Sequence, residues 1–273
     1  MRLLVALLLA LFLSSCSGML YYPSQQLYFD PAKFGLKPEE IYFLSADNTK
    51  LFGWWFRHPK PKAVFVLYHG NGGNISGQYV KMLWAVKANY DLFAFDYRGY
   101  GRSEGSPNPE GTVQDGEAAL RWVYSQYPGT PIVIVGQSLG GAVALRNAID
   151  LKDEIPFRAV VIDSSFPSYQ GVGNAVLARS WITWPFQWIA YLVLSDRFAP
   201  DGEIQKIAPV PLLVMHSEGD RTVPFSLGEK IYSQAGEPKE FWKIPGEGHT
   251  DAFLRFGDTY TTKLEDWLHD KIK

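Results

Sequence analysis

The sequence is short of cysteine and of net charge, and each shortage excludes a class of protein. Its single cysteine, Cys16, has no partner within the chain, so an intramolecular disulfide cannot stabilise the fold. Lysine and arginine together number 26, aspartate and glutamate 28, and the formal net charge is −2 without a basic run. A nucleic-acid partner is therefore not expected, because such surfaces need clustered positive charge.

Metal-binding and phosphate-binding patterns are also missing. No group of His, Cys, Asp and Glu residues has the spacing of a metal site, and no glycine-rich phosphate or dinucleotide fingerprint follows the first strand. Internal repeats and low-complexity segments are absent as well. The sequence therefore predicts chemistry without a metal or an organic cofactor, in a chain whose 273 residues suit one large domain.

The N-terminal residues have the pattern of a targeting segment. Arg2 precedes the almost wholly apolar run 3–13, which is short for a membrane-spanning helix. Residues 13–16, Leu-Ser-Ser-Cys, resemble the lipobox of bacterial lipoproteins. The resemblance implies a signal peptide over 1–15, a lipid anchor on Cys16 and a place in the bacterial cell envelope. Ser17 in place of aspartate favours the outer membrane in a Gram-negative host; an ordinary secretory signal with an incidental cysteine is the alternative.

The rest of the chain reads as a membrane-proximal segment, 16–40, followed by one domain, 41–273. The first segment is aromatic and contains proline, so we expect it to pack on the domain rather than to act as a flexible tether. Strands are predicted at 41–44, 51–57, 63–68, 91–95, 132–135, 158–162, 211–215 and 240–244, and helices near 76–88, 110–125, 139–150, 226–235 and 250–271. After an initial antiparallel pair, this alternation predicts a mostly parallel α/β sheet with helices on both faces.

Ser138 lies in the most informative motif, Gly-Gln-Ser-Leu-Gly at 136–140. The β-branched run 132–135 before it reads as a buried strand, and 141–149 after it reads as a helix. Strand, sharp turn and helix together form a nucleophile elbow, which lifts the serine hydroxyl clear of the sheet. Ser103 fits the same Gly-x-Ser-x-Gly pattern, but the prolines that soon follow prevent a helix, and we interpret it as a loop hydroxyl.

A nucleophilic serine needs a base, and the base needs an orienting acid. His249 follows the strand 240–244 in a glycine-rich loop and is the predicted base. Asp220 follows the strand 211–215 and is the predicted acid, with Glu218 as its rival. His216 competes with His249 by position, but we expect it to support its own loop. The chain order serine, aspartate, histidine is that of the α/β-hydrolases.

The oxyanion that forms during attack requires backbone N–H donors. Leu139, directly after the nucleophile, supplies one. The loop 69–74, His-Gly-Asn-Gly-Gly-Asn, follows the strand 63–68, and we assign the second donor to the Asn71 amide. His69 is expected to brace this loop rather than to act as a base.

These motifs, together with Asp-Tyr-Arg-Gly-Tyr-Gly at 96–101, resemble the α/β-hydrolase superfamily of serine hydrolases. Within it, the chain is similar to the α/β-hydrolase-domain subgroup, which includes membrane-associated protein depalmitoylases. The resemblance covers roughly residues 21–270 and implies an α/β-hydrolase fold. Ser-Glu at 217–218, where the family more often has glycine after the histidine, loosens the match at the acid loop.

Residues 168–201 interrupt the alternation of strands and helices and are rich in tryptophan. We interpret them as a short cap over the site, which would favour an apolar or acyl substrate; one ordinary crossover helix is the alternative. The sequence therefore predicts a membrane-anchored esterase or thioesterase that forms an acyl-enzyme on Ser138. A serine aminopeptidase-like amide hydrolase and a non-catalytic lipoprotein that binds an envelope partner are the remaining hypotheses.

Overall fold

The computed structural model describes residues 20–273, so the predictions of a signal peptide and of an anchor on Cys16 lie outside the described residues. Its strands are β1 Tyr22–Pro23, β2 Glu39–Leu44, β3 Lys50–Phe56, β4 Val64–Tyr68, β5 Gly72–Gly73, β6 Asp91–Asp96, β7 Ile132–Gln137, β8 Ala159–Asp163, β9 Leu212–Ser217 and β10 Lys239–Ile244. Its α-helices are α2 Ile75–Gln78, α3 Leu83–Lys87, α4 Pro109–Gln126, α5 Leu139–Leu151, α6 Tyr169–Leu177, α7 Ala190–Val193, α8 Phe225–Gln234, α9 Ala252–Arg255 and α10 Asp258–His269. Short 3₁₀ helices lie at Pro31–Phe34, Tyr79–Met82, Trp184–Ile189 and Ile204–Ile207.

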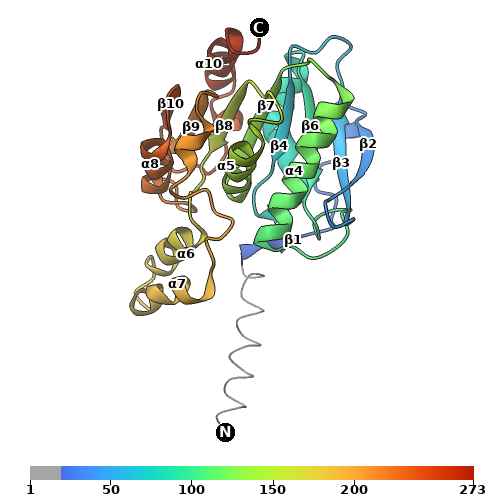
Figure 1. The fold of residues 1–273 in the computed structure, drawn as a ribbon. Coiled ribbons are helices and arrows are strands. Elements are labelled where there is room, and N and C mark those ends of the chain that lie inside the picture. The colour runs from blue at the N-terminus through green and yellow to red at the C-terminus, as the bar shows by residue number, and fades with distance from the viewer. Residues whose placement is uncertain (1–19) are drawn as a thin grey trace.

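Eight strands form one sheet in the order β10-β9-β8-β7-β4-β6-β3-β2 (Figure 1). All neighbours are parallel except β3, which runs antiparallel to both β2 and β6. The predicted antiparallel pair and the predicted mostly parallel sheet are both confirmed. The parallel order brings the carboxyl ends of β4, β7, β8, β9 and β10 to one edge, where the loops that carry chemistry meet.

Helices cover both faces of the sheet because its central strands are apolar on both sides. In β4, Val64 and Val66 point into a core shared with α4, α5 and α8. Phe65 and Leu67, at the alternate positions, point into a second core shared with α2, α3, α9 and α10. The period of two in a strand thus explains why this segment is apolar throughout.

Two predicted helices are broken in the structure. The range 76–88 contains a 3₁₀ turn between α2 and α3, which places Tyr79 against Phe56 with ring centroids 5.2 Å apart. The range 250–271 divides into α9 and α10 at Gly257, whose φ of 43° suits glycine rather than a residue with a side chain. Both ranges are therefore helical as predicted, but tertiary packing and one glycine set the boundaries of the helices.

The described part of the N-terminal segment packs on the domain, as expected. Strand β1 pairs in parallel with β5, which lies in the loop after β4. The Asn74 side-chain amide donates to the carbonyl oxygens of Ser24 and Gln26 at 2.7 and 2.8 Å, and the Tyr28 amide donates to Ser76 Oγ at 3.0 Å. These bonds fasten the segment across the loop that carries Asn71.

The insertion between β8 and β9 contains α6, the 3₁₀ helix Trp184–Ile189 and α7, and it projects beyond the carboxyl edge of the sheet (Figure 1). Asp196 joins the two ends of the insertion, because it accepts hydrogen bonds from Ser168 Oγ at 2.6 Å and from the Gln170 amide at 3.1 Å. The alternative of one ordinary crossover helix does not describe these short elements. We call residues 168–201 the cap.

Candidate active site

Ser138 occupies the sharp turn between β7 and α5. Its φ of 53° and ψ of −122° are unusual for a residue with a side chain, which is the strained geometry of a nucleophile elbow. A Cβ atom at Gly136 would lie 2.6 Å from the Gly141 Cα, and one at Gly140 would lie 2.2 Å from the Tyr68 carbonyl oxygen. The flanking glycines are therefore required by close backbone approach, as the motif predicted.

Asp220 and His249 are brought together from the loops after β9 and β10. His249 Nδ1 donates to Asp220 Oδ2 at 2.7 Å, and the amides of Thr222 and Val223 donate to Oδ1 at 2.7 and 3.0 Å. Burial alone would raise the pKa of Asp220, but the His216 imidazole, whose Nε2 lies 3.5 Å from Oδ2, and the His249 hydrogen bond outweigh it and hold the pKa well below its usual range. Glu218, the rival acid, is exposed. Asp220 is thus placed to remain ionised beside an imidazole.

The Ser138 hydroxyl makes no hydrogen bond to His249 within residues 20–273. Such bonds are often long or absent until substrate binds, so the free geometry does not argue against the pair. Ser138 is itself largely buried, and its side chain borders the cavity described below.

His69 and His216, which are fully buried, have structural partners. His216 Nε2 donates to the Val223 carbonyl oxygen at 3.0 Å, which supports the acid loop as expected. His69 Nδ1 donates to the Gly70 carbonyl oxygen at 2.7 Å, and burial lowers the pKa of His69 to about 4. His69 therefore stays neutral and braces its loop.

Two backbone amides near Ser138 are available as donors. Leu139 is the first residue of α5, and an N–H group in that position has no acceptor within its helix. The Asn71 amide donates to no acceptor among residues 20–273, while its side-chain Oδ1 accepts from the Tyr22 amide at 2.9 Å and from the Tyr100 hydroxyl at 3.2 Å. The N-terminal segment therefore helps to position the Asn71 loop.

A cavity of about 330 Å³ lies in front of Ser138. Asn71 and Leu139 border it with Ser138, and the remainder of its wall is mainly apolar, with Leu20 from the N-terminal segment and Val176, Leu177, Val193 and Leu194 from the cap. No aspartate or glutamate of the described chain lines it. The site is therefore suited to an apolar group next to the serine.

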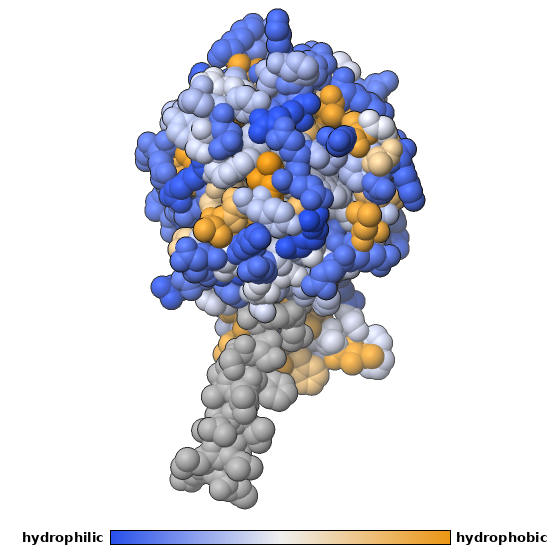
Figure 2. All heavy atoms as spheres, turned by 90° about the vertical axis from the view of Figure 1, so that its right-hand side faces the viewer, coloured by the Kyte–Doolittle hydropathy of each residue, from blue (hydrophilic) through white to orange (hydrophobic). Residues whose placement is uncertain are grey.

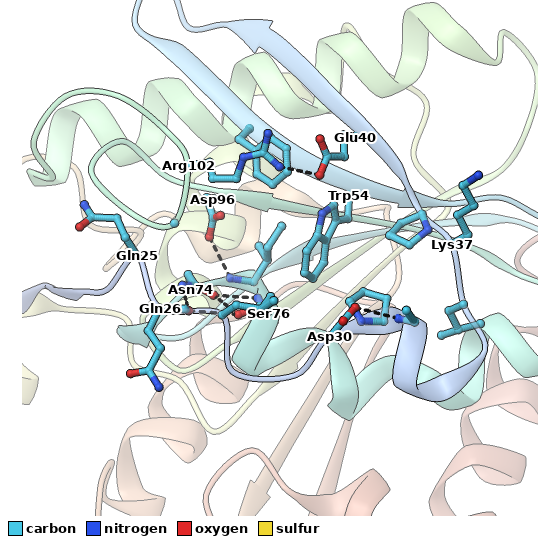
Figure 3. A pocket seen from close by; sticks show the side chains of 18 residues that line it. Gln25, Gln26, Asp30, Lys37, Glu40, Trp54, Asn74, Ser76, Asp96 and Arg102 are labelled. Atoms are coloured by element: carbon cyan, nitrogen blue, oxygen red, sulfur yellow. Dashed lines mark hydrogen bonds and ion pairs between the residues drawn. The ribbon is translucent and has the colours of Figure 1, made fainter.

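A larger cavity, of about 520 Å³, lies between the N-terminal segment and β3 and contains none of these residues (Figure 3). Polar side chains that line it already have hydrogen-bond or ion-pair partners. Asp96 Oδ1 accepts from the Ile75 amide at 2.8 Å, and Arg102 pairs with Glu40 at 2.5 Å. We interpret it as a packing gap beneath the N-terminal segment rather than as the place of reaction.

Sequence reasoning missed a buried polar network behind Ser138. Ser165 Oγ donates to the Ser138 carbonyl oxygen at 2.7 Å. Ser164 Oγ donates to Asp163 at 3.0 Å and accepts from the Thr250 amide at 3.3 Å, directly after His249. Burial raises the pKa of Asp163, and the Ser164 hydrogen bond partly offsets this. The polar residues 163–165, at the carboxyl end of a predicted strand, could have indicated this network from the sequence.

Ser103, the second serine in a Gly-x-Ser-x-Gly pattern, is a structural hydroxyl. Its Oγ donates to the Asp96 carbonyl oxygen at 2.7 Å and accepts from the Phe52 amide at 2.9 Å. Both bonds tie the loop 97–105 to the sheet, so the predicted loop role is confirmed.

A family model described as serine aminopeptidase, S33, matches residues 59–200, which is more than half of the chain. The chain belongs to this family of α/β-hydrolases. YfhR of Escherichia coli K12 is 34% identical over 257 residues, covering 91% of this chain and 85% of that protein. The lysophosphatidylserine lipase ABHD12 of Danio rerio is 30% identical over 248 residues, covering 83% and 63%.

The solved structures agree on the fold of this S33 α/β-hydrolase. The esterase Pf2001 of Pyrococcus furiosus superposes with a TM-score of 0.74 at 19% identity, over 93% of this chain and 98% of the esterase. The predicted α/β-hydrolase fold and superfamily are confirmed, and the protein is a hydrolase of that family. The likeness to the depalmitoylase-containing subgroup stays a prediction. Within residues 20–273, no helix has both the length and the apolar character needed to cross a membrane.

Proposed function

We propose that the protein is a serine esterase or thioesterase that acts through an acyl-enzyme on Ser138. The observation that carries the proposal is the meeting of three features at one sheet edge. A strained serine elbow, a His249–Asp220 hydrogen bond of 2.7 Å and the Asn71 and Leu139 amides all lie at the carboxyl ends of neighbouring strands. This set contains the nucleophile, base, orienting acid and oxyanion donors of acyl transfer.

In the proposed reaction, His249 takes the proton from Ser138 as the serine oxygen attacks the acyl carbonyl. Asp220 holds the imidazole with Nδ1–H toward itself and stabilises the imidazolium that forms. The Asn71 and Leu139 amides donate to the oxyanion. The tetrahedral intermediate collapses and the leaving alcohol or thiol takes the proton from His249. Water, activated by the same histidine, then releases the acid and restores Ser138.

The cavity favours an ester or thioester with an apolar acyl group over a peptide. An aminopeptidase needs a carboxylate to hold the substrate amine, and the described cavity wall has none. Glu218 is exposed, and Glu247, also exposed, pairs with Arg221 at 2.6 Å. The family description names aminopeptidase activity, so amide hydrolysis is the second candidate to be tested directly.

A substrate series separates these functions. Purified protein is assayed with nitrophenyl esters from two to sixteen carbons, the matching thioesters, and an aminoacyl anilide. We expect turnover of esters or thioesters that improves as the acyl chain lengthens to fill the cavity, and loss of turnover in a folded Ser138→Ala variant. Preference for the anilide would support the aminopeptidase function instead. Equal rates for Ser138→Ala and wild type would overturn the assignment.

We further propose that Cys16 carries a lipid that anchors the enzyme in the bacterial cell envelope, in the outer membrane if the host is Gram-negative. The support is the lipobox-like sequence at 13–16 after an apolar run. Two or more acyl chains suffice for stable anchoring, whereas one does not. Growth with an alkyne-tagged fatty acid should label the wild type and leave Cys16→Ala unlabelled; label on the variant would refute the anchor.

A further inference from the structure

The cap carries an exposed apolar surface, which we call the cap patch, formed by Trp181, Ile182, Trp184, Phe186, Trp188 and Leu192. Trp181 is 85% exposed and Leu192 65% exposed. Soluble proteins seldom leave so many large apolar side chains together in water, and such surfaces mark contacts with membranes or other proteins. In Figure 2 the visible face of the body is mostly hydrophilic with separate hydrophobic areas, and hydrophobic residues also show at the lower end beside the grey atoms.

The sequence of the cap patch is unlike that of a solvent-facing segment. Residues 180–195 contain no charged side chain; Arg179 precedes this run, and Asp196 and Arg197 follow it. The 3₁₀ helix Trp184–Ile189 has no buried residue. Its apolar side chains are therefore not explained by packing on the domain. A charge-free segment rich in tryptophan matches the composition of segments that lie at the membrane–water interface.

The position of the cap patch points to the same partner. Leu20, the first described residue, lines the cavity together with cap residues Val176 and Val193. Cys16 is only four positions earlier in the sequence, so a lipid on it would be tethered beside the cap. A chain of four residues spans at most about 14 Å. This argument rests on the proposed lipid anchor; the exposure of the cap patch does not.

We propose that the cap patch docks on a lipid bilayer and inserts its aromatic side chains at the interfacial level. Other residues of the same cap, Val176, Leu177, Val193 and Leu194, line the cavity. Docking would therefore place the approach to Ser138 next to the membrane. Acyl substrates held in the bilayer would then reach the site without crossing water. A bilayer explains the three tryptophans, the lack of charge over 180–195 and the nearby anchor position together, whereas a second copy of the chain explains only the apolar surface.

The test uses the intact, lipidated protein in vesicles of phosphatidylethanolamine and phosphatidylglycerol whose acyl chains carry bromine, a short-range quencher of tryptophan fluorescence. We expect strong quenching for the wild type. A variant with Trp181, Trp184 and Trp188 changed to Phe keeps six of the nine tryptophans and should show little quenching. Quenching as strong in that variant as in the wild type, or none in the wild type, would overturn the proposal.

A matched pair of double variants tests the apolar contact itself. Ile182→Ser/Leu192→Ser removes side chains that are 61% and 65% exposed in the cap, and Leu44→Ser/Leu254→Ser removes ones that are 58% and 56% exposed elsewhere. We expect the cap pair to lower quenching at least twofold and the control pair to leave it unchanged. An equal loss in both pairs would contradict a localised contact.

Two further measurements distinguish membrane docking from self-association and from a failure of the proposed chemistry. Sedimentation that shows a dimer in the wild type and a monomer in the cap pair, without quenching, would assign the cap patch to a second copy and overturn membrane docking. Hydrolysis of a water-soluble short ester should be the same in the wild type and both double variants, while hydrolysis of a vesicle-held long-chain ester should fall only in the cap pair. Absence of both ester and thioester hydrolysis would refute the proposed function and leave the quenching result interpretable.

Discussion

Replacing Asp96 with asparagine tests the electrostatics beneath the Asn71 loop. His69 Nε2 and Asp96 Oδ1 lie 3.7 Å apart, and both side chains are fully buried. Burial lowers the pKa of His69 from 6.5 to about 4 and raises the pKa of Asp96 from 3.8 to about 7. Between about pH 4 and pH 6.5 the pair therefore holds one proton in the folded protein and one in the unfolded chain. Folding moves this proton from histidine to aspartate, and the pair adds no pH dependence to stability.

Each single substitution leaves only one of the two titrating groups, so that the free energy of unfolding then depends on pH. In Asp96→Asn, the unfolded chain binds one more proton, on His69, so the free energy of unfolding should rise with pH by about 1.4 kcal/mol per unit relative to wild type. Over the window from about 4 to 6.5 this reaches about 3 kcal/mol. In His69→Gln, the folded state binds the extra proton on Asp96, so stability should fall by about 4 kcal/mol as pH rises from about 4 to 7.

The assay is urea unfolding followed by tryptophan fluorescence at half-unit steps from pH 4.5 to pH 7. Differences from wild type at each pH cancel the titration of other carboxylates. Opposite slopes for the two variants are the expected result. Parallel curves for wild type and Asp96→Asn would refute the reasoning, because the pair would then not share a single proton.

Three further substitutions test individual side chains at or near the site. Asp220→Asn, which holds His249 in the wrong tautomer, should lower kcat by about 10⁴-fold while circular dichroism stays unchanged. Asn71→Ala keeps the backbone donor but loses two side-chain hydrogen bonds, and kcat should fall about tenfold with little change in KM. Arg98→Met leaves the buried Asp115 carboxylate unpaired and should lower the free energy of unfolding by about 3 kcal/mol in urea titrations.

Much of the sheet and the serine elbow could be predicted because their signals are local. The run 132–135, the two glycines around Ser138 and the following apolar helix specify strand, turn and helix within about twenty residues. Asp220 and His249 were found the same way, as polar residues after apolar strands. The sequence could not decide between Asp220 and Glu218 as the partner of His249, because both acids follow the same strand. The structure shows the hydrogen bond to Asp220.

Features that depend on distant contacts were not predictable. Strand β1 forms because residues 22–23 meet Gly72–Gly73, and neither pair has a strand pattern of its own. The polar network of Asp163, Ser164 and Thr250 joins two loops that are 86 positions apart. The division of the cap into α6, a 3₁₀ helix and α7 goes with contacts among these three elements, which the sequence does not reveal.

Labelling with a fluorophosphonate, followed by mass spectrometry of the modified peptide, identifies an activated serine directly. We expect one label on Ser138 in the wild type and none in Ser138→Ala. An unlabelled wild-type protein would contradict an activated serine and favour a lipoprotein that binds without catalysis. A label on Ser103 or another serine would show that the nucleophile has been assigned to the wrong turn.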